Sequence, residues 1–299
     1  MTLKHPTETY HKKPYPAIDP NRPELSQNGR TVLITGGATG IGFAIARAFV
    51  AASASRIILV GRRASKLDDA IANLQRLSGA QSTNLVQRSC DVTELDQVAK
   101  LWAKLAEEGI VVDTMVVNAA TIGSAGSVLE RGTLNVWQDF TMNVRAVMDF
   151  TERFYKQTGK GASDKKYLVN VSSSAIHEWA GRAKALQSYG LTKNAGTLYM
   201  QQVARAIPVT EMQVISIHPG SILTEAARKA GYDENSGVPW DDENLPGRYA
   251  VWAASPEAEK LHGRFVWVHW DVAQLLSGAS LKRIEDEDDY LKIGVIGLA

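Results

Sequence analysis

The segment from residue 31 to residue 49 constrains the fold most, because a strand, a glycine loop and a helix follow one another there without a break. The strand is apolar, and the loop reads Thr35-Gly-Gly-Ala-Thr-Gly-Ile-Gly42. Apolar residues then recur at helical spacing: Ile41, Ala44, Ile45, Ala48 and Phe49. A buried strand that turns directly into a helix is typical of a parallel sheet with crossover helices.

The same alternation continues to residue 270. Apolar runs predict strands at 31–35, 56–60, 84–92, 112–118, 166–173, 213–218 and 264–270. Helical patterns separate them at 65–77, 93–108, 134–155 and from 174 through Tyr189, with Thr93 as the expected cap of the second. Near-continuous apolar strands between helices predict an α/β fold: one Rossmann-type, doubly wound parallel sheet of about seven strands, with helices on both faces.

The chain divides into three parts. Residues 1–29 carry five prolines and predict an extended arm that is ordered only where it docks on the body. Residues 30–275 predict one domain, and 276–299 a tail packed on it. The acidic run 285–289 is most simply a solvated part of that tail.

Composition excludes several classes of protein. A net charge of +1 gives no indication of binding to nucleic acid or to an anionic membrane. The single cysteine, Cys90, allows no intrachain disulfide, and no apolar run is long enough to span a bilayer. The N-terminus has no apolar signal region, so we expect a cytoplasmic protein. No residues have metal-ligand spacing, and no Gly-x-Ser-x-Gly hydrolase turn is present.

The glycine loop predicts a dinucleotide site. Gly36 permits a tight turn after the strand, while Gly40 and Gly42 let the next helix approach a phosphate closely. The helix N-terminus offers unpaired N–H groups and a partial positive charge to a pyrophosphate. Glycines that merely end a strand are the alternative, which the flanking strand and helix disfavour.

The end of the second strand indicates which dinucleotide binds. An NAD site usually has an acidic residue there for the ribose hydroxyls. This chain instead reads Val60-Gly61-Arg62-Arg63, and the next acids lie a turn or more into the helix. Two guanidinium groups suit a 2′-phosphate, so NADP(H) is favoured over NAD. The alternative is that both arginines are ordinary solvated charges.

Tyr189 and Lys193 are four residues apart, so they lie on one face of a helix. Alone, the pair could be a simple surface contact. Beside a dinucleotide site, a phenol next to an ammonium group predicts proton transfer, because a free phenol titrates near pH 10 and needs help to work near neutrality.

Seven motifs in order resemble the short-chain dehydrogenases/reductases, in their one-domain branch, over residues 30–275. They are the glycine loop, Cys90-Asp91-Val92, Val117-Asn118-Ala119-Ala120, Asn143, Val169-Asn-Val-Ser-Ser173, Tyr189 with Lys193, and His218-Pro-Gly-Ser-Ile-Leu-Thr224. The segment Phe265–Trp270 is similar to fungal members of secondary metabolism.

The resemblance implies roles for these residues. Tyr189 is the expected general acid/base, with Lys193 lowering its pKa and binding the nicotinamide ribose. Ser173 is expected on the substrate carbonyl, and Asn143 in a proton relay with the lysine and water. The other expected cofactor contacts are Thr39 and Ile41 in the glycine loop, Asp91 and Val92 at the adenine, Asn118 in the cleft, and Pro219, Ile222 and Thr224 at the carboxamide.

Two departures from the family pattern concern the site. Ala120 stands where the family has glycine, which removes backbone freedom near the cofactor. Three serines are consecutive, and the gap from Ser173 to Tyr189 is longer than usual. The motif favours Ser173 as the catalytic serine, whereas spacing alone favours Ser174. The extra residues, 176–181, would border the substrate.

Residues 225–248 are polar and glycine-containing, and predict a mobile lid. Its Tyr232 and Trp240, with Trp179, would form an aromatic pocket for a bulky carbonyl compound, or else anchor the lid. We expect His218 to be structural and His177 to be a weaker candidate for substrate contact. The resemblance also implies a homodimer or homotetramer through the helices near 134–155 and 186–206.

These expectations combine into an NADPH-dependent ketoreductase, or alcohol dehydrogenase in reverse, that acts on a bulky, aromatic or polyketide-like substrate in secondary metabolism. A dehydratase, isomerase or cyclase without net redox chemistry is the alternative on the same fold. A non-catalytic NADP-binding protein is disfavoured, because it needs no activated phenol.

Overall fold

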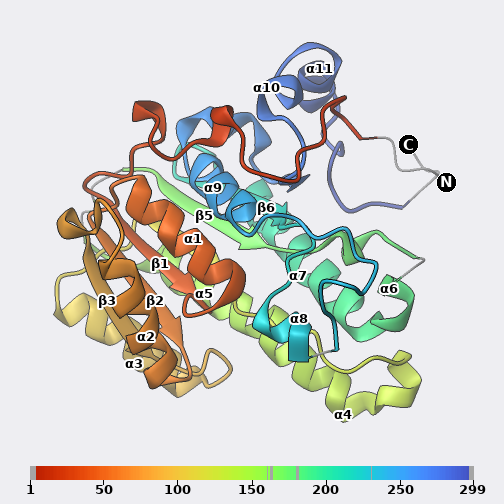
Figure 1. Cartoon of the computed structure of the whole chain (residues 1–299), viewed down its shortest axis with the longest axis horizontal. Coiled ribbons are helices and arrows are strands. Elements are labelled where there is room, and N and C mark those ends of the chain that lie inside the picture. Colours follow the sequence, from red (N-terminus) through yellow and green to blue (C-terminus); the bar gives the residue numbers. More distant parts are fainter. Residues whose placement is uncertain (1–4, 160, 162–163, 180–181, 230, 296–299) are drawn as a thin grey trace.

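The computed structural model describes residues 5–159, 161, 164–179, 182–229 and 231–295. Its centre is a parallel sheet of seven strands in the order β3-β2-β1-β4-β5-β6-β7 (Figure 1). The strands are β1 Thr31–Thr35, β2 Arg56–Gly61, β3 Asn84–Ser89, β4 Thr114–Val117, β5 Lys166–Val171, β6 Met212–His218 and β7 Phe265–Trp267. The predicted doubly wound parallel fold is confirmed.

The strand order reverses between β1 and β4, which pair from Val32↔Thr114 to Ile34↔Val116. Every residue of β1, β4 and β6 is buried, as continuous apolar runs predict for strands covered on both faces. Because parallel strands all end at one edge, their following loops meet there, and a reversal point is where such sheets bind ligands.

Helices cover both faces of the sheet (Figure 1). One apolar core includes residues of α1, α2 and α9, and the other includes residues of α3, α5 and α7. The helices are α1 Gly40–Ala51, α2 Ala64–Gln75, α3 Leu95–Glu107, α4 Val128–Phe140, α5 Ala146–Lys156, α6 Arg182–Ala185, α7 Gln187–Ala206, α8 Glu225–Lys229, α9 Asn244–Ala253, α10 Val272–Leu275 and α11 Gly278–Asp286, with a π-helical turn at Thr141–Arg145.

Four predicted strands are too long, because their ends leave the sheet to form loops. They are 84–92, 112–118, 166–173 and 264–270, which correspond to β3, β4, β5 and β7. After β3, a side-chain oxygen of Asp91 accepts hydrogen bonds from the backbone N–H (2.9 Å) and hydroxyl (2.7 Å) of Thr93, which turns the chain away. The Thr93 hydroxyl therefore does not cap α3: Glu94 stands at that N-cap, without a side-chain cap bond.

Two predicted helices are wrong in extent. The helix expected from 174 through Tyr189 is instead a short turn at Ser174–Ile176, then α6 and the start of α7, so Tyr189 lies in the first turn of α7. The helix expected from 134 begins earlier, at a capping box formed by Ser127 and Glu130, and is kinked at Gly132, where φ is +72°.

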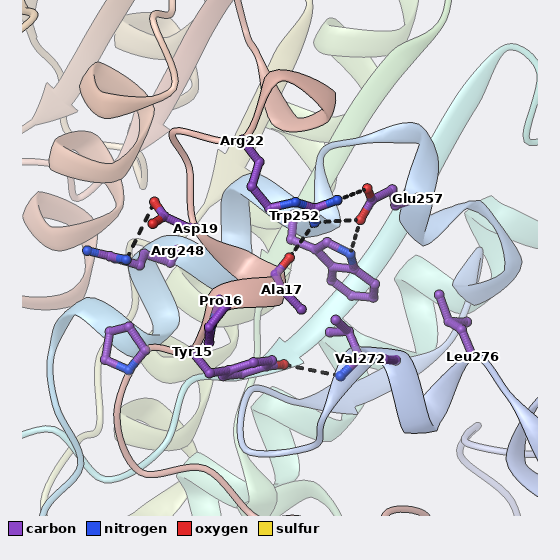
Figure 2. Close-up of a pocket in the computed structure, with 12 residues that line it drawn as sticks. Tyr15, Pro16, Ala17, Asp19, Arg22, Arg248, Trp252, Glu257, Val272 and Leu276 are labelled. Atoms are coloured by element: carbon purple, nitrogen blue, oxygen red, sulfur yellow. Dashed lines mark hydrogen bonds and ion pairs between the residues drawn. The ribbon is translucent and has the colours of Figure 1, made fainter.

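The N-terminal arm docks on its own chain, and it is not uniformly extended. It forms turns at Pro16–Ile18 and Pro23–Leu25, and the side chains of Ile18 and Leu25 are fully buried. Figure 2 shows Arg22 paired with Glu257 at 2.6 Å, and the hydroxyl of Tyr15 accepting from the backbone N–H of Val272 at 3.2 Å. Residues 1–4 of the predicted arm lie outside the described residues.

A cavity of about 1020 Å³ lies between this arm, α9 and α10 (Figure 2). Pro14, Asp19, Arg248 and Trp252 are among its lining residues, and none of the predicted site residues is. It is therefore separate from the site that the motifs predict.

The tail packs along the outer edge of β7. The backbone N–H of Phe265 donates to the carbonyl of Leu291 at 2.9 Å, and Ile284 of α11 is buried. Residues 296–299 of the predicted tail lie outside the described residues. Within the described part of the chain, no helix is long and apolar enough to cross a membrane, and no group of three or more His, Cys, Asp or Glu residues could hold a metal ion.

Candidate active site

The glycine loop between β1 and α1 is built around contacts that exclude side chains. Gly36 has a φ of +65°, which favours glycine, and a Cβ atom there would lie 3.0 Å from Nδ2 of Asn118. A Cβ atom on Gly42 would lie 2.2 Å from the carbonyl oxygen of Gly36. The first turn of α1 is thereby pressed against the loop. Thr39, its N-cap, makes no side-chain cap bond, so the helix end remains open to an anion.

Asn118 braces this loop from the end of β4. Its Nδ2 donates to the carbonyls of Thr35 at 3.0 Å and Gly36 at 3.2 Å, while its own N–H donates to the Thr35 hydroxyl at 3.0 Å. Sequence reasoning placed Asn118 in the cleft but missed the partnership with Thr35. Thr35 is the last residue of β1 and Asn118 directly follows β4, and these two strands are neighbours in the sheet, which is the signal that could have predicted the contact.

Arg62 and Arg63 follow the end of β2 and are both exposed. One guanidinium nitrogen of Arg62 lies 3.8 Å from the carboxylate of Asp91, and Arg63 is the N-cap of α2. Val92, next to Asp91, is buried. Two cations therefore lie at a strand end that carries no acid of its own.

Tyr189, Lys193 and Ser173 come together at the end of β5. The Ser173 hydroxyl hydrogen-bonds the phenol of Tyr189. Lys193, one turn further along α7, is buried and donates from Nζ to the carbonyl of Val171 at 2.6 Å. A hydroxyl, a phenol and an ammonium group thus share one short stretch of β5 and α7.

The pKa of Tyr189 corrects one expectation. We expected Lys193 to lower it, but in this structure burial raises the pKa of Tyr189, and the hydrogen bond from Ser173 opposes that rise. Burial also lowers the pKa of Lys193 to about 8. The phenol therefore keeps its proton near neutral pH.

The three consecutive serines have distinct partners. Ser172 is buried and its hydroxyl bonds that of Thr197 at 2.5 Å, whereas Ser173 faces Tyr189. The backbone N–H of Ser174 donates to Nδ1 of His218 at 3.1 Å. The geometry thus favours the serine that the motif indicates over the one that spacing indicates.

His218, at the end of β6, ties that strand to the serine turn. Nδ1 can accept the bond from Ser174 only while it carries no proton. Burial, with His269 and His177 nearby, holds the pKa of His218 well below its usual value. The imidazole is therefore neutral and structural, as the sequence suggested.

Asn143 lies in the π-helical turn between α4 and α5 and is buried. Its amide donates to the carbonyl of Thr121 and to the hydroxyl of Thr192, both at 2.9 Å. Both amide hydrogens are thus used for these contacts rather than for Lys193. The backbone carbonyl of Asn143 lies against Gly196 of α7 instead. A Cβ atom on that glycine would be only 2.8 Å from the carbonyl oxygen. Such π-helical turns often occur at functional sites.

A buried ion pair missed by the sequence analysis lies beside this site. Arg131 and Asp139 of α4 are 2.8 Å apart, and Ser188, the neighbour of Tyr189, donates to the same Asp139 oxygen at 2.6 Å. It joins α4 to the start of α7. The kink at Gly132 separates the two partners of the pair, so no regular helical spacing could have predicted it.

The loop after β6 reaches across to the glycine loop. A Cβ atom on Gly40 would lie 3.0 Å from the methyl carbon of Thr224, so the two segments touch. Thr224 also accepts a bond from the N–H of Ala227 and begins α8, while Pro219 and Ile222 are buried. Ile41, in the first turn of α1, is half-buried against the core. The segments expected at the pyrophosphate and at the carboxamide of the cofactor thus touch each other.

The predicted lid is shorter than expected. Residues 244–248 belong to α9, and Gly247 packs so closely on α1 that a Cβ atom would lie 2.6 Å from the Ala44 carbonyl. Tyr232 and Trp240 contact each other within the lid, at 6.1 Å between ring centroids.

Trp179 lies elsewhere, which corrects the predicted three-residue aromatic pocket. It lines a cavity of about 850 Å³ with Ile176, His177, Trp267 and Trp270. The cavity adjoins the turn that follows Ser173, and its walls are rich in aromatic rings. Of the extra residues 176–181, Ala180 and Gly181 lie outside the described residues.

The fold, the glycine loop and the strand-end residues define a nucleotide-binding α/β protein of the Rossmann type. Residues 30–235 match the short chain dehydrogenase family, and the chain belongs to that family of oxidoreductases, as the motifs predicted.

The chain is similar to fungal members. It is 31% identical over 291 residues to the short chain dehydrogenase/reductase AacuD of Aspergillus aculeatus, which covers 97% of this chain and 96% of that protein. It is 32% identical to the short chain dehydrogenase/reductase nsrO of Aspergillus novofumigatus, with 97% of each chain covered.

Solved structures share the fold. A short-chain type dehydrogenase/reductase from Mycobacterium ulcerans superposes with a TM-score of 0.72 at 24% identity, covering 90% of this chain and 100% of that one. An actinorhodin polyketide ketoreductase with NADPH superposes with a TM-score of 0.68 at 19% identity, covering 81% and 97%.

Proposed function

We propose that this protein is an NADPH-dependent ketoreductase, and an alcohol dehydrogenase in the reverse direction. The observation that carries the proposal is the contact between the Ser173 hydroxyl and the Tyr189 phenol, with the buried Lys193 one turn away. A scaffold protein gains nothing from placing a phenol and a buried lysine together beside a phosphate-binding loop.

Bound NADPH would supply a hydride to the carbonyl carbon of the substrate. The Ser173 oxygen accepts a bond from the N–H of Ala175 at 3.2 Å, which holds the hydroxyl beside Tyr189, where we expect it to orient the substrate carbonyl. Tyr189 keeps its proton near neutral pH, as a phenol whose pKa is raised by burial must, and it delivers that proton to the carbonyl oxygen as the hydride arrives. The charge of Lys193 then stabilises the phenolate that remains.

After the reaction Tyr189 must regain a proton, and we propose that Asn143 helps to deliver it. Its amide is fixed by Thr121 and Thr192, so its backbone carbonyl is held toward α7, the helix that carries Lys193. We infer that a water on this carbonyl links the lysine to solvent. Asn143 thus acts through its main chain, and its side chain keeps the π-helical turn in place.

Cofactor choice rests on Arg62 and Arg63. Both are exposed beyond β2, where they can turn toward a 2′-phosphate. We place Thr39–Gly42 on the pyrophosphate, Asp91 and Val92 at the adenine, Asn118 in the cleft, and Pro219, Ile222 and Thr224 at the carboxamide. Support for the last group is the contact between Thr224 and Gly40, which brings the loop after β6 against the glycine loop.

We infer a bulky, aromatic or polyketide-like carbonyl substrate. The cavity of about 850 Å³ beside the turn after Ser173 supports this, because its lining includes three tryptophans, a phenylalanine and a tyrosine. Fungal relatives support a role in secondary metabolism.

We also propose a cytoplasmic homodimer or homotetramer. Large apolar side chains are exposed on α4 and α7, where Leu134 is 81%, Trp137 67% and Leu198 39% exposed. Burial of these side chains against a second copy would remove them from water.

The decisive experiment is a binding titration of NADPH against NADH, followed by NADPH oxidation with a panel of aromatic and polyketide-like ketones. We expect tighter NADPH binding and oxidation by at least one ketone. Tyr189→Phe should keep binding and lose turnover. Normal turnover by that variant would contradict the mechanism, and binding without oxidation would favour the non-redox alternative.

A further inference from the structure

The loop after β6 is held in place by the carboxylate of Asp241, which no sequence motif predicts. Oδ2 of Asp241 accepts a hydrogen bond from the N–H of Ser221 at 2.7 Å, and the N–H of Asp241 donates to the Ser221 carbonyl at 2.9 Å. Gly220 has a φ of +87°, and a Cβ atom there would lie 2.7 Å from the same Oδ2. The carboxylate therefore fixes both the position and the conformation of this loop.

His269 is the second partner of that carboxylate. Its Nε2 lies 2.9 Å from Oδ2 of Asp241, and the two side chains are only 2% and 4% exposed. His269 follows β7, so the pair joins the C-terminal end of the lid to the sheet. A buried carboxylate that loses a partner is left uncompensated, so each member constrains the other.

The N-terminal arm closes over this pair. The ring of Tyr10 stacks on that of His269, with centroids 4.4 Å apart and planes 8° from parallel. The N–H of His11 donates to the His269 carbonyl at 2.7 Å, and the N–H of Asp242 donates to the Lys12 carbonyl at 2.9 Å. The arm thus contacts His269 and the residue after Asp241, and its anchors near Arg22 and Tyr15 hold it there (Figure 2).

We propose that Asp241 and His269, covered by Tyr10, are positioning residues that fix the Pro219–Thr224 loop for the nicotinamide end of the cofactor. The inference rests on the proposed function, which gives that loop its ligand. None of the three residues takes part in the chemistry. They act by fixing the backbone at Ser221, in the way that a supporting shell holds a binding group in its productive geometry.

The first test needs no cofactor. Hydrogen exchange is measured for the peptide that contains Ser221 in the wild type, Asp241→Asn and His269→Gln. We expect the exchange rate at this peptide to rise about tenfold, which corresponds to a loss of about 1.4 kcal/mol of protection. Asp271→Asn is the matched control: Asp271 also pairs with a histidine of the arm-to-body contact, His11, at 2.9 Å, but it lies away from the loop.

The second test separates positioning from folding. We expect Asp241→Asn and Tyr10→Ala to raise KM for NADPH about tenfold while kcat changes little, and Tyr10→Phe, which keeps the stacked ring, to restore the wild-type value. Unchanged exchange at the Ser221 peptide, or equal effects in Asp271→Asn, would overturn the inference. A wild type that binds no NADPH would instead contradict the proposed function, and the exchange result would still decide whether the pair fixes the loop.

Discussion

Gly42 lies so close to Gly36 that a Cβ atom on Gly42 would meet the Gly36 carbonyl oxygen at 2.2 Å and Nδ2 of Asn118 at 2.6 Å. The carbonyl belongs to the backbone and cannot yield as a flexible side chain would. We expect Gly42→Ala to lower the free energy of unfolding by about 1–3 kcal/mol, as overpacking does elsewhere. It should also abolish measurable NADPH binding in a fluorescence titration.

Gly294→Ala is the control for that variant, because a Cβ atom on Gly294 meets nothing within 4 Å. Equal NADPH affinity in Gly42→Ala and the wild type would show that the loop does not hold the phosphates.

Replacing Arg62 and Arg63 together by alanine should weaken NADPH binding about 10- to 100-fold, because charge-assisted bonds contribute about 1.5–3 kcal/mol. NADH affinity should stay nearly constant, since NADH has no 2′-phosphate. Arg76→Ala, at the other end of α2, controls for the loss of positive charge. A parallel loss for both cofactors would argue against recognition of the 2′-phosphate.

The rate should depend on pH through Lys193. Burial lowers its pKa to about 8, so the ammonium is charged below that pH and loses its proton above it. We therefore expect kcat/KM, which reports the free enzyme, to fall as pH rises through about 8. Lys193→Arg keeps its charge and should lack this fall, whatever its maximal rate. A profile that stays flat to pH 10 in the wild type would contradict the role of the ammonium group.

Acid should destabilise the fold through its neutral histidines. The pKa of His218 is held well below 6.5 in the folded chain, so below pH 6.5 the unfolded chain binds more protons, and stability falls as pH falls. The pKa values of His177 and His262 are lowered in the same direction. We expect Tm to drop between pH 7 and pH 5, and to drop less in His218→Asn, whose amide oxygen can still accept from Ser174.

Trp179→Ala should discriminate between ketones by size. Trp179 is 87% exposed and lines the aromatic cavity, so its loss should leave the fold intact and remove one wall. We expect KM to rise several-fold for a polycyclic ketone and to stay constant for a small one. Equal changes for both ketones would place the bulky part of the substrate elsewhere.

The sheet and the glycine loop were predictable, because each depends on local pattern, whereas the grouping of Ser173 with Tyr189 was implied only by the resemblance to the family. Other contacts could not be predicted. Asp241 and His269 are brought together by an irregular lid, and Arg131 meets Asp139 across a kinked helix. The helix expected from 174 through Tyr189 failed because helical spacing says nothing of the turns that interrupt it. The pKa of Tyr189 depends on burial that only the folded chain shows.

The segment around Leu291 changes what the edge strand β7 can do. An uncovered edge strand presents a row of unpaired backbone groups that invites another chain to extend the sheet. Here the backbone N–H of Phe265 already donates to the carbonyl of Leu291, and α11 packs beside it. The tail therefore occupies the outer side of β7 and blocks strand-to-strand association there.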